Sequence, residues 1–505
     1  MTFDPDAAYQ ALAARDARFD GRLFVGVTST HIYCRPICRV RTPLRKNCRF
    51  FETPAQAEAA AFRPCLKCRP EIAPGHNPAW TVMDASATLA RQAAAQLDAQ
   101  LDIQLDTHTA DGEPPSIAAL AAKLGVSDRH LRRIFLAEHG VTPLQYLQTR
   151  RLLLAKHLLT DSTLAVSQVA LASGFKSLRR FNAAFADGYR MSPSRLRGEG
   201  RLSSRSGAAA ASAASDAITV TLAYRPPYDA AALLRFVAQR AIPGIEHIAS
   251  TAIRRTLRAG TVAPQAGWIE ATFEASQPVV RLRYSSTLAS ASGRVVRAAR
   301  RWLDLDASPE TIATALHDLP GVPGLRLPGS LDAFELAVRA VLGQQVTVAG
   351  ARTLARRLVE RFGVAVTTPW PEVDRLFPAP EAIAALEPAQ IAELGIVRTR
   401  AGAIIAIAQA WPTVEACLAH HASADELIAH LVALPGIGPW TAHYIAMRAL
   451  GWPDAFPPGD VAVLKAMKAL FGTTSQREAD AQARAWQPWR AYAVLRLWNS
   501  LEKST

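Results

Sequence analysis

Residues 434–460, LPGIGPWTAHYIAMRALGWPDAFPPGD, decide the fold of the C-terminal part of the chain. Gly436 and Gly438 permit positive φ and close backbone approach, which predicts a tight turn between two helices. Backbone N–H groups at the start of the second helix can cradle a phosphate. Asp460 ends a stiff Pro-Pro-Gly loop that can hold one carboxylate in a fixed place. The alternative is an ordinary turn between helices with a surface aspartate.

The combination L-P-G-I-G-P-W-T-A, with P-x-D at residues 458–460, is more specific than the turn alone. It resembles the helix–hairpin–helix DNA glycosylases, most closely the AlkA-type 3-methyladenine-DNA glycosylase II. The resemblance implies that Asp460 is the catalytic carboxylate. N3- and N7-alkylated purines are cationic and leave without a strong general acid, so one carboxylate that stabilises the oxocarbenium-like sugar suffices.

The same resemblance implies a pocket for a flipped-out base, in which aromatic faces favour a cation. By motif match its aromatics are Trp440, Tyr444 and Trp498, although any one of them could instead be a core residue. The residues that it places against DNA are Gly436, Gly438, Thr441 and Gln345. Gln345 maps to the wedge that fills the vacated stack, where the best-known relatives carry an apolar residue.

Two absences refine the expected chemistry. Lyase-competent relatives carry a Lys after the G-x-G-x turn, and this chain has Trp440 there, which predicts a monofunctional glycosylase. No cysteine cluster follows the hairpin motif, so no iron–sulfur cluster is expected.

Composition indicates several soluble domains with an anionic partner. The chain has 505 residues, a formal net charge of +14 and six cysteines. A single core does not reach this length, and basic residues along the whole chain favour DNA, although a solvated basic surface would look the same. The acidic N-terminus MTFDPDAAYQ is not a signal peptide, and we expect no membrane-spanning segment. A cytoplasmic, nucleoid-associated protein of bacterial type is expected.

Residues 1–75 contain two close cysteine pairs, Y-C-R-P-I-C and R-P-C-L-K-C-R-P. Short pairs of this kind predict one Zn²⁺ bound by four thiolates, which would also staple a domain this small. The ligands are Cys34, Cys38, Cys65 and Cys68. Cys48 has no close partner and is expected to be buried.

This segment resembles the N-terminal domain of the Ada-type adaptive-response protein. The resemblance implies that Cys34 accepts a methyl group from a DNA methylphosphotriester, in a stoichiometric methylphosphotriester-DNA:protein-cysteine methyltransferase reaction. The alternative is a purely structural zinc site. Basic residues near the cysteines are candidates for phosphate contact: Arg35, Arg39, Arg45 and Lys46.

Residues 80–200 contain two helix-turn-helix patterns. Each has apolar residues at helical spacing, a glycine turn (Gly125, Gly174) and a basic second helix. Together with G-F-K-S-x-x-x-F-x-x-x-F and M-S-P-S-x-L-R, they resemble the AraC-type DNA-binding domain that follows the zinc domain in Ada. The resemblance implies a transcriptional activator, with RNA polymerase as a further partner. The expected DNA-reading residues are Arg129, His130, Arg132, Arg133, Lys176, Arg179 and Arg180.

The sequence therefore predicts a multidomain protein, mainly α with α+β parts. Its parts are a zinc domain (1–75), a double helix-turn-helix domain (80–200), a flexible linker (201–217), a small antiparallel β domain (218–292) and a helix–hairpin–helix glycosylase domain (293–505). In the β domain, strands are expected at 218–224 and 279–285, with a helix near 230–240. The predicted function combines DNA repair at two sites with transcriptional regulation. The alternative is an alkylation-sensing activator with an inactive glycosylase domain.

Overall fold

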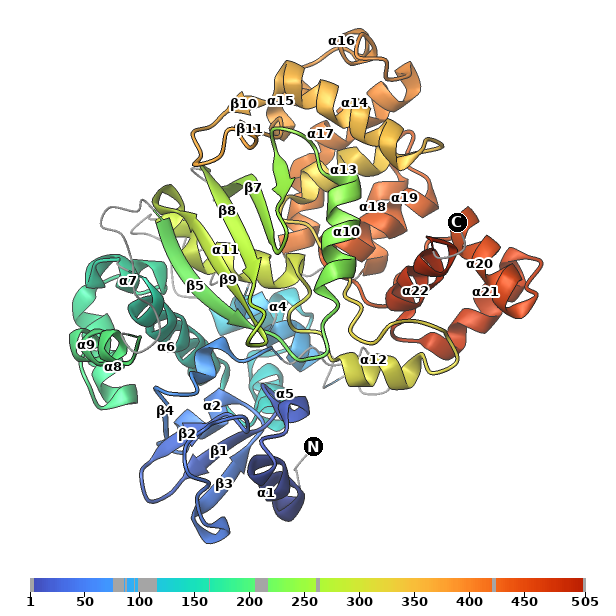
Figure 1. Cartoon of the computed structure of the whole chain (residues 1–505). Helices are drawn as coiled ribbons and strands as arrows, with labels where there is room; N and C mark the ends of the chain where they lie inside the picture. Colours follow the sequence, from blue (N-terminus) through green and yellow to red (C-terminus); the bar gives the residue numbers. More distant parts are fainter. Residues whose placement is uncertain are drawn as a thin grey trace.

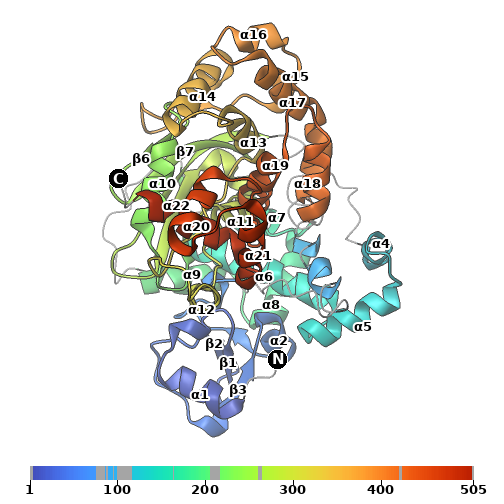
Figure 2. The same ribbon diagram turned by 90° about the vertical axis from the view of Figure 1, so that its right-hand side faces the viewer.

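The computed structural model describes residues 4–75, 86, 89–94, 96–98, 116–162, 164–204, 217–259, 264–419 and 424–502. Figure 1 shows the zinc domain in blue at one end, the helix-turn-helix helices beside it, the five-stranded sheet in the middle and the C-terminal helices around the far end. The view in Figure 2 shows α4 and α5 projecting from the side of the molecule.

The N-terminal domain is a four-stranded sheet with strand order β3-β1-β2-β4. Strands β2 and β4 pair in parallel, with Tyr33 opposite Pro64. Cys34, the last residue of β2, and Cys65, the residue after β4, therefore lie at the same end of the sheet. The elements are α1 (Pro5–Ala13), η1 (Ala17–Phe19), β1 (Phe24–Val27), β2 (Ile32–Cys34), η2 (Arg45–Asn47), β3 (Cys48–Phe51), α2 (Pro54–Ala59), β4 (Arg63–Pro64) and η3 (Pro70–Ile72).

Both predicted helix-turn-helix units are confirmed. Ser127 and Ser177 cap the second helix of their units, accepting hydrogen bonds from the backbone N–H groups of His130 and Arg180 at 3.2 Å. Gly125 and Gly174 have the positive φ that the turns require. The helices are α4 (Ile117–Lys123), α5 (Asp128–His139), the connecting helix α6 (Pro143–Asp161), α7 (Val166–Ala172), α8 (Leu178–Tyr189) and α9 (Pro193–Ser204).

The β domain is one antiparallel sheet with strand order β5-β9-β8-β7-β6. Both expected strands and the expected helix are present, and three further strands, β6, β7 and β8, complete the sheet. The elements are β5 (Ala217–Ala223), α10 (Ala230–Arg240), β6 (Glu246–Ile248), β7 (Ala252–Ala259), β8 (Gln265–Phe273), β9 (Val279–Ser285) and η4 (Ser286–Ala291).

The described residues after 292 are mainly helical, apart from a short strand pair, β10 (Val364–Ala365) with β11 (Arg375–Leu376), that the sequence did not predict. The helices are α11 (Ser292–Trp302), α12 (Pro309–Ala315), α13 (Ala333–Leu342), α14 (Val348–Phe362), α15 (Pro380–Ala384), α16 (Pro388–Ala392), α17 (Arg398–Ala419), α18 (Ala424–Val432), α19 (Pro439–Ile445), the π-helical turn η5 (Ala446–Leu450), α20 (Val461–Phe471), α21 (Gln476–Ala483), η6 (Arg484–Trp486) and α22 (Arg490–Glu502).

One helix, α17, is long and apolar enough to cross a membrane by length and composition alone, which the sequence analysis did not anticipate. Half of the apolar stretch within Arg398–Leu418 is buried, and the helix packs against α13, α15, α16 and α18. Its residues Ile404, Ile407 and Trp411 belong to the core of the helical domain. This is the packing of a core helix in a globular domain.

The second helix-turn-helix unit and the five-stranded sheet share one hydrophobic core. Helix α6 packs against β5, and a single cluster of buried residues includes Leu158 and Phe181 together with Val220 and Leu282. Residues 201–204, assigned to the flexible linker, continue helix α9. The rest of that predicted linker, up to residue 216, lies outside the described residues.

Candidate functional site

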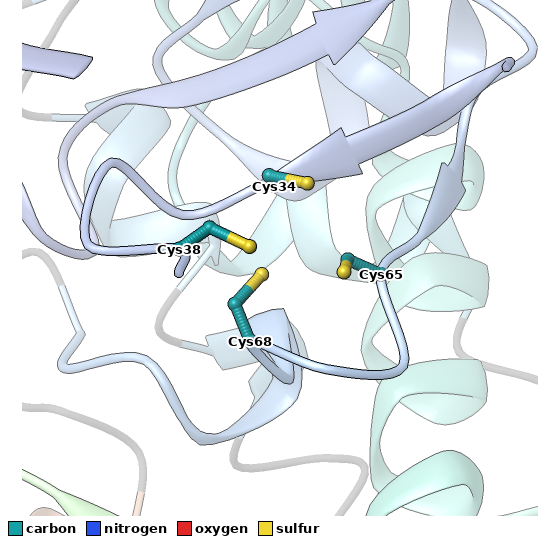
Figure 3. Close-up of side chains that lie close together, drawn as sticks. All are labelled: Cys34, Cys38, Cys65 and Cys68. Carbon is teal, nitrogen blue, oxygen red and sulfur yellow. The ribbon is translucent and has the colours of Figure 1, made fainter. Parts of the chain in front are cut away.

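The four cysteines of the predicted metal site lie together. Their sulfur atoms are all within 4.8 Å of one another, and Figure 3 shows them converging on one point. Cys34 ends β2, Cys65 follows β4, and the other two lie in the turns that come after each strand. Four thiolates at this separation fit the tetrahedral coordination of Zn²⁺, in which each sulfur is about 2.3 Å from the metal. The predicted ligand set is brought together as a unit.

The Cys68 sulfur receives a hydrogen bond from the backbone, because the N–H of Arg35 donates to Cys68 Sγ at 3.3 Å. A hydrogen bond to a thiolate stabilises its negative charge and lowers its reactivity, so this contact disfavours Cys68 as a nucleophile.

Cys48 is separate from this cluster. Its thiol is buried and donates to the carbonyl oxygen of Leu44 at 3.4 Å. Burial raises the pKa of Cys48, while the nearby Arg45 opposes that shift, so the thiol stays neutral. The prediction that Cys48 is simply buried is confirmed.

The expected phosphate contacts near the cysteines divide into two groups. Arg39 and Lys46 are exposed, and Arg45 is partly exposed and ion-paired with Asp6 at 3.0 Å. Arg35 is different, because its side chain is only 4% exposed and forms a two-pronged ion pair with Asp20, including a 2.7 Å bond from Nε to Oδ1. The prediction that Arg35 contacts DNA is therefore wrong for this structure: its guanidinium is used inside the protein.

A partly buried carboxyl group, that of Glu58 in α2, lies where the zinc domain contacts α6. Tyr33, which precedes Cys34, donates its hydroxyl to Glu58 Oε1 at 3.0 Å. Burial raises the pKa of Glu58 to about 8, although hydrogen bonds from Thr149 and Tyr33 and the charge of Lys156 partly offset this. The native protein therefore keeps Glu58 protonated at neutral pH.

This raised pKa predicts a pH-dependent stability. The folded state binds a proton at Glu58 that the unfolded state releases near pH 4.5, so stability falls as pH rises towards and through 8. Between pH 7 and 9 we expect the wild type to lose about 1 kcal/mol relative to Glu58→Gln, which stays neutral throughout. Urea unfolding of both proteins across this range measures the difference. Parallel pH profiles would contradict the assignment.

The predicted DNA-reading residues lie on the surfaces of the two recognition helices. Arg129, Arg132 and Arg133 are exposed on α5, and Arg179 and Arg180 are exposed on α8. Lys176 is exposed in the turn before α8, and His130 is partly exposed, with Nδ1 3.0 Å from Arg133. Both helices present an accessible basic face of the kind that enters a major groove.

Asp460 is held in place by three donors. It is the N-cap of α20, and its Oδ1 accepts the Val463 N–H at 2.8 Å. The indole N–H of Trp440 donates to Oδ2 at 2.8 Å, and that of Trp498 donates to Oδ1 at 3.2 Å. Asp460 is 6% exposed. Charge on a buried carboxylate that is fixed in this way acts strongly on a nearby developing cation.

The three predicted aromatics come together around this carboxylate. Trp440 and Tyr444 are stacked, with ring centroids 5.2 Å apart and an interplanar angle of 10°. Trp498 is 6.4 Å from Tyr444 and tilted by 42°. All three are only partly buried, so aromatic faces border the carboxylate rather than filling a closed core.

Two residues of this region were missed from the sequence. Arg448 donates to the Tyr444 hydroxyl at 2.7 Å and to the Pro328 carbonyl at 2.8 Å. Its guanidinium also lies over the rings of Phe236 and Tyr444, and it lines one pocket with Phe236 and Arg240. The i,i+4 spacing from Tyr444 could have indicated Arg448. Phe236 lies more than two hundred residues away, so no local pattern indicates it.

The hairpin and the predicted wedge loop are connected. Gly436 has a φ of +79°, and a Cβ there would lie 2.7 Å from that of Ala403, so the turn requires glycine. Gly438, exposed, is the N-cap of α19. Gln344 donates to the Gly436 carbonyl at 3.1 Å and to Thr441 Oγ1 at 3.0 Å. Gln345 is exposed in the left-handed region, with a φ of +53°.

Thr441 differs from its predicted role. Its side chain is 3% exposed and its hydroxyl accepts the bond from Gln344, so it faces the wedge loop rather than solvent. Cys417, at the end of α17, is buried as expected of a core residue.

Comparisons with known proteins agree with this arrangement. Four family models match: the metal binding domain of Ada (residues 7–71), a helix-turn-helix domain (120–199), the AlkA N-terminal domain (219–332) and the HhH-GPD superfamily base excision DNA repair protein (338–491). Together they follow the predicted order of domains.

Among curated relatives, the chain is 36% identical to a probable bifunctional transcriptional activator/DNA repair enzyme AlkA of Mycobacterium tuberculosis, over 99% of this chain and 97% of that protein. It is 33% identical to the Escherichia coli DNA-3-methyladenine glycosylase 2, over 55% of this chain and 96% of that protein. A solved 3-methyladenine DNA-glycosylase from Archaeoglobus fulgidus covers 55% of this chain and 96% of its own, at 21% identity and a TM-score of 0.46. The chain belongs to the family of bifunctional transcriptional activator/DNA repair enzymes of the AlkA type, in which an Ada-type metal-binding domain and a helix-turn-helix domain precede a glycosylase.

Proposed function

We propose that this protein repairs alkylated DNA at two separate sites and regulates transcription through its helix-turn-helix domain. The observation that carries the repair function is the Asp460 carboxylate, held by two indole N–H groups beside a Trp–Tyr stack. The chain spans nearly the whole length of a relative that bears both functions in its name.

At the glycosylase site, the proposed reaction is hydrolysis of the N-glycosidic bond of 3-methyladenine- or 7-methylguanine-type purines. The flipped base stacks against the faces of Trp440 and Tyr444, which favour its positive charge. As the bond to the base breaks, positive charge develops on the sugar, and Asp460 stabilises it. The base leaves as a neutral molecule, and water adds to the cationic sugar and releases one proton.

We propose that the glycosylase is monofunctional. A lyase needs an amine to attack the sugar, and the residue after the hairpin turn is Trp440, whose indole N–H is engaged by Asp460. Borohydride reduction during turnover is therefore expected to leave no covalent protein–DNA product. A trapped complex, mapped to a lysine, would contradict this assignment.

At the zinc domain, we propose that Cys34 accepts a methyl group from a methylphosphotriester. Bound zinc would keep the four cysteine sulfurs as thiolates at neutral pH. Cys34 Sγ attacks the methyl carbon in line, the S–C bond forms, the C–O bond breaks, and its electron pair leaves on an ordinary phosphodiester. Loss of one negative charge at the site lowers its repulsion from DNA, so the same event can act as a switch for promoter binding.

One experiment tests both proposals. The full chain is incubated with methylated duplex DNA, released bases are measured by chromatography, and the recovered protein is weighed by intact mass spectrometry. Base release with a gain of one methyl supports both sites. A mass gain without release would favour the alternative, an alkylation-sensing regulator with an inactive glycosylase. Release of bases without a gain in protein mass would show that the zinc site is purely structural. In cells we place this work in the cytoplasm at the nucleoid, with RNA polymerase as the partner during activation.

A further inference from the structure

The last turn of the zinc domain, residues 69–75, contacts both other parts of the protein. Arg69, which follows the ligand Cys68, donates to Asp161 Oδ1 at 2.6 Å, at the end of helix α6. The other oxygen of Asp161 accepts the backbone N–H of Thr221, in strand β5, at 3.0 Å. One carboxylate thus joins the metal-ligand loop, the helix-turn-helix domain and the glycosylase half.

A second junction is built around Arg225, in the loop after β5. It is 2% exposed, and its five N–H donors all reach backbone carbonyls. Three of these carbonyls belong to the zinc domain, and the distances are 2.8 Å to Asp20, 3.3 Å to Pro74 and 2.6 Å to Gly75. The other two belong to Asp306 and Ala307. Only a planar guanidinium offers this many donors in a fixed array.

Two further contacts surround this junction. The backbone N–H of Gly75 donates to Asp306 Oδ1 at 2.5 Å, and Lys156 of α6 forms a buried ion pair with Glu71. A Cβ at Gly21 would lie 1.8 Å from the carbonyl oxygen of Pro74, within the zinc domain, and 3.0 Å from Arg225 Nη2, so the junction leaves no room for a side chain at Gly21. Burial lowers the pKa of Arg225 to about 10, which is still high enough to keep the side chain charged at neutral pH.

The contacts at Arg225 lead directly to the metal site. Asp20, whose carbonyl binds Arg225, uses its carboxylate to hold Arg35. Arg35 follows Cys34 in the chain, and it donates through its backbone N–H to Cys68 Sγ at 3.3 Å and through Nη1 to the Cys68 carbonyl at 3.1 Å. The loop conformation that brings the four cysteines together therefore also positions Asp20, Arg69 and Gly75 for their contacts with the rest of the protein.

We propose that metal binding by the four cysteines controls the docking of the zinc domain onto α6 and the glycosylase half. A domain of this size depends on its metal for a fixed fold, and the docking residues lie on the loops that the metal orders. With metal bound, the methyl-acceptor site and the glycosylase site belong to one body. Without metal, the domain is released. The inference goes beyond the two repair reactions and does not depend on either of them.

The test uses the full chain with a protease recognition sequence inserted between residues 76 and 85, so that the zinc domain can be cut from the rest. Size exclusion and native mass spectrometry after cleavage show whether the two pieces stay together. We expect them to co-elute when zinc is bound and to separate after zinc is removed with a chelator. Separation in zinc would overturn docking, and co-elution after chelation would overturn its dependence on metal.

Variants at the two junctions sharpen this test. Arg225→Met keeps a long side chain but loses all five donors, and Asp161→Asn weakens the other junction if Arg225→Met fails to fold. Both are expected to separate after cleavage although zinc is present. The matched control is Arg281→Met, since Arg281 is exposed on β9 and pairs with Glu274 at 3.0 Å.

If zinc binding favours docking, docking must favour zinc binding by the same factor. Arg225→Met in the uncut chain is therefore expected to weaken zinc binding by about tenfold, as measured by competition with a chelator. An unchanged zinc affinity for a variant that no longer docks would show that metal binding and docking are independent.

Discussion

Asp460→Asn is expected to lower the rate of alkylpurine excision by at least about a hundredfold, the scale seen when one preorganised electrostatic group is removed. The substitution removes the negative charge that faces the developing cation. Asn is also a good N-cap, so α20 should keep its start. The new amide must accept bonds from Trp440 and Trp498, and its NH2 group cannot accept either of them. Single-turnover release of bases from methylated duplex DNA measures the loss.

The matched control is Asp229→Asn, the same change at the N-cap of another helix. Asp229 accepts the Ala232 N–H at 2.8 Å at the start of α10. This variant should excise bases at the wild-type rate, and both variants should unfold at similar temperatures. Full excision by Asp460→Asn would remove Asp460 from the catalytic role and leave the aromatic pocket without its carboxylate.

Cys34→Ala is expected to abolish the methyl gain completely. Among the four clustered sulfurs, Cys68 accepts a hydrogen bond from the backbone N–H of Arg35, which stabilises its thiolate, and Cys34 holds the position that the resemblance to Ada-type proteins assigns to the acceptor. A thiolate that is less stabilised attacks the methyl carbon more readily. Intact mass after exposure to DNA that carries methylphosphotriesters measures the gain, and zinc content is measured beside it.

Cys48→Ala is the control for this experiment, because Cys48 is a buried cysteine outside the cluster. It should gain one methyl like the wild type. Cys68 is the least buried of the four ligands, so it is the other candidate acceptor. A methyl gain that persists in Cys34→Ala and maps to Cys68 by peptide analysis would transfer the role to that residue.

Local patterns predicted much of the two repair sites. The glycines of the hairpin are required by backbone geometry, and the Ser caps of the recognition helices follow from hydrogen bonds that span three residues. The cysteine pairs sit in turns whose spacing suits one tetrahedral metal. Asp460 was identified because its loop and the hairpin motif are close in sequence. Such features depend on interactions within a few residues, which is why the sequence alone contains them.

The sequence was less informative about whether a side chain is exposed to solvent or bound to a residue far away in the chain. Arg35 is basic and lies beside the cysteines, as expected of a phosphate contact. Its ion pair with Asp20 nevertheless keeps its side chain buried. Thr441 lies in the hairpin motif that was expected to contact DNA. Its hydroxyl instead accepts a hydrogen bond from Gln344, between α13 and α14, and its side chain is buried. Neither outcome follows from the local pattern, since exposure depends on which surface another segment covers.

The sequence by itself therefore determined the four domains, their order and the cluster of four cysteines, and it singled out Asp460 as the predicted catalytic residue, because each rests on local backbone geometry or on a compact motif. The tertiary structure alone decided the contacts of Arg448 with Tyr444 and Phe236 and the contacts of the zinc domain around Arg225. Arg225 and Asp20 are 205 positions apart, and five carbonyls from separate segments converge on one guanidinium only after the whole chain has packed. Long-range packing, and not residue type, fixes those contacts.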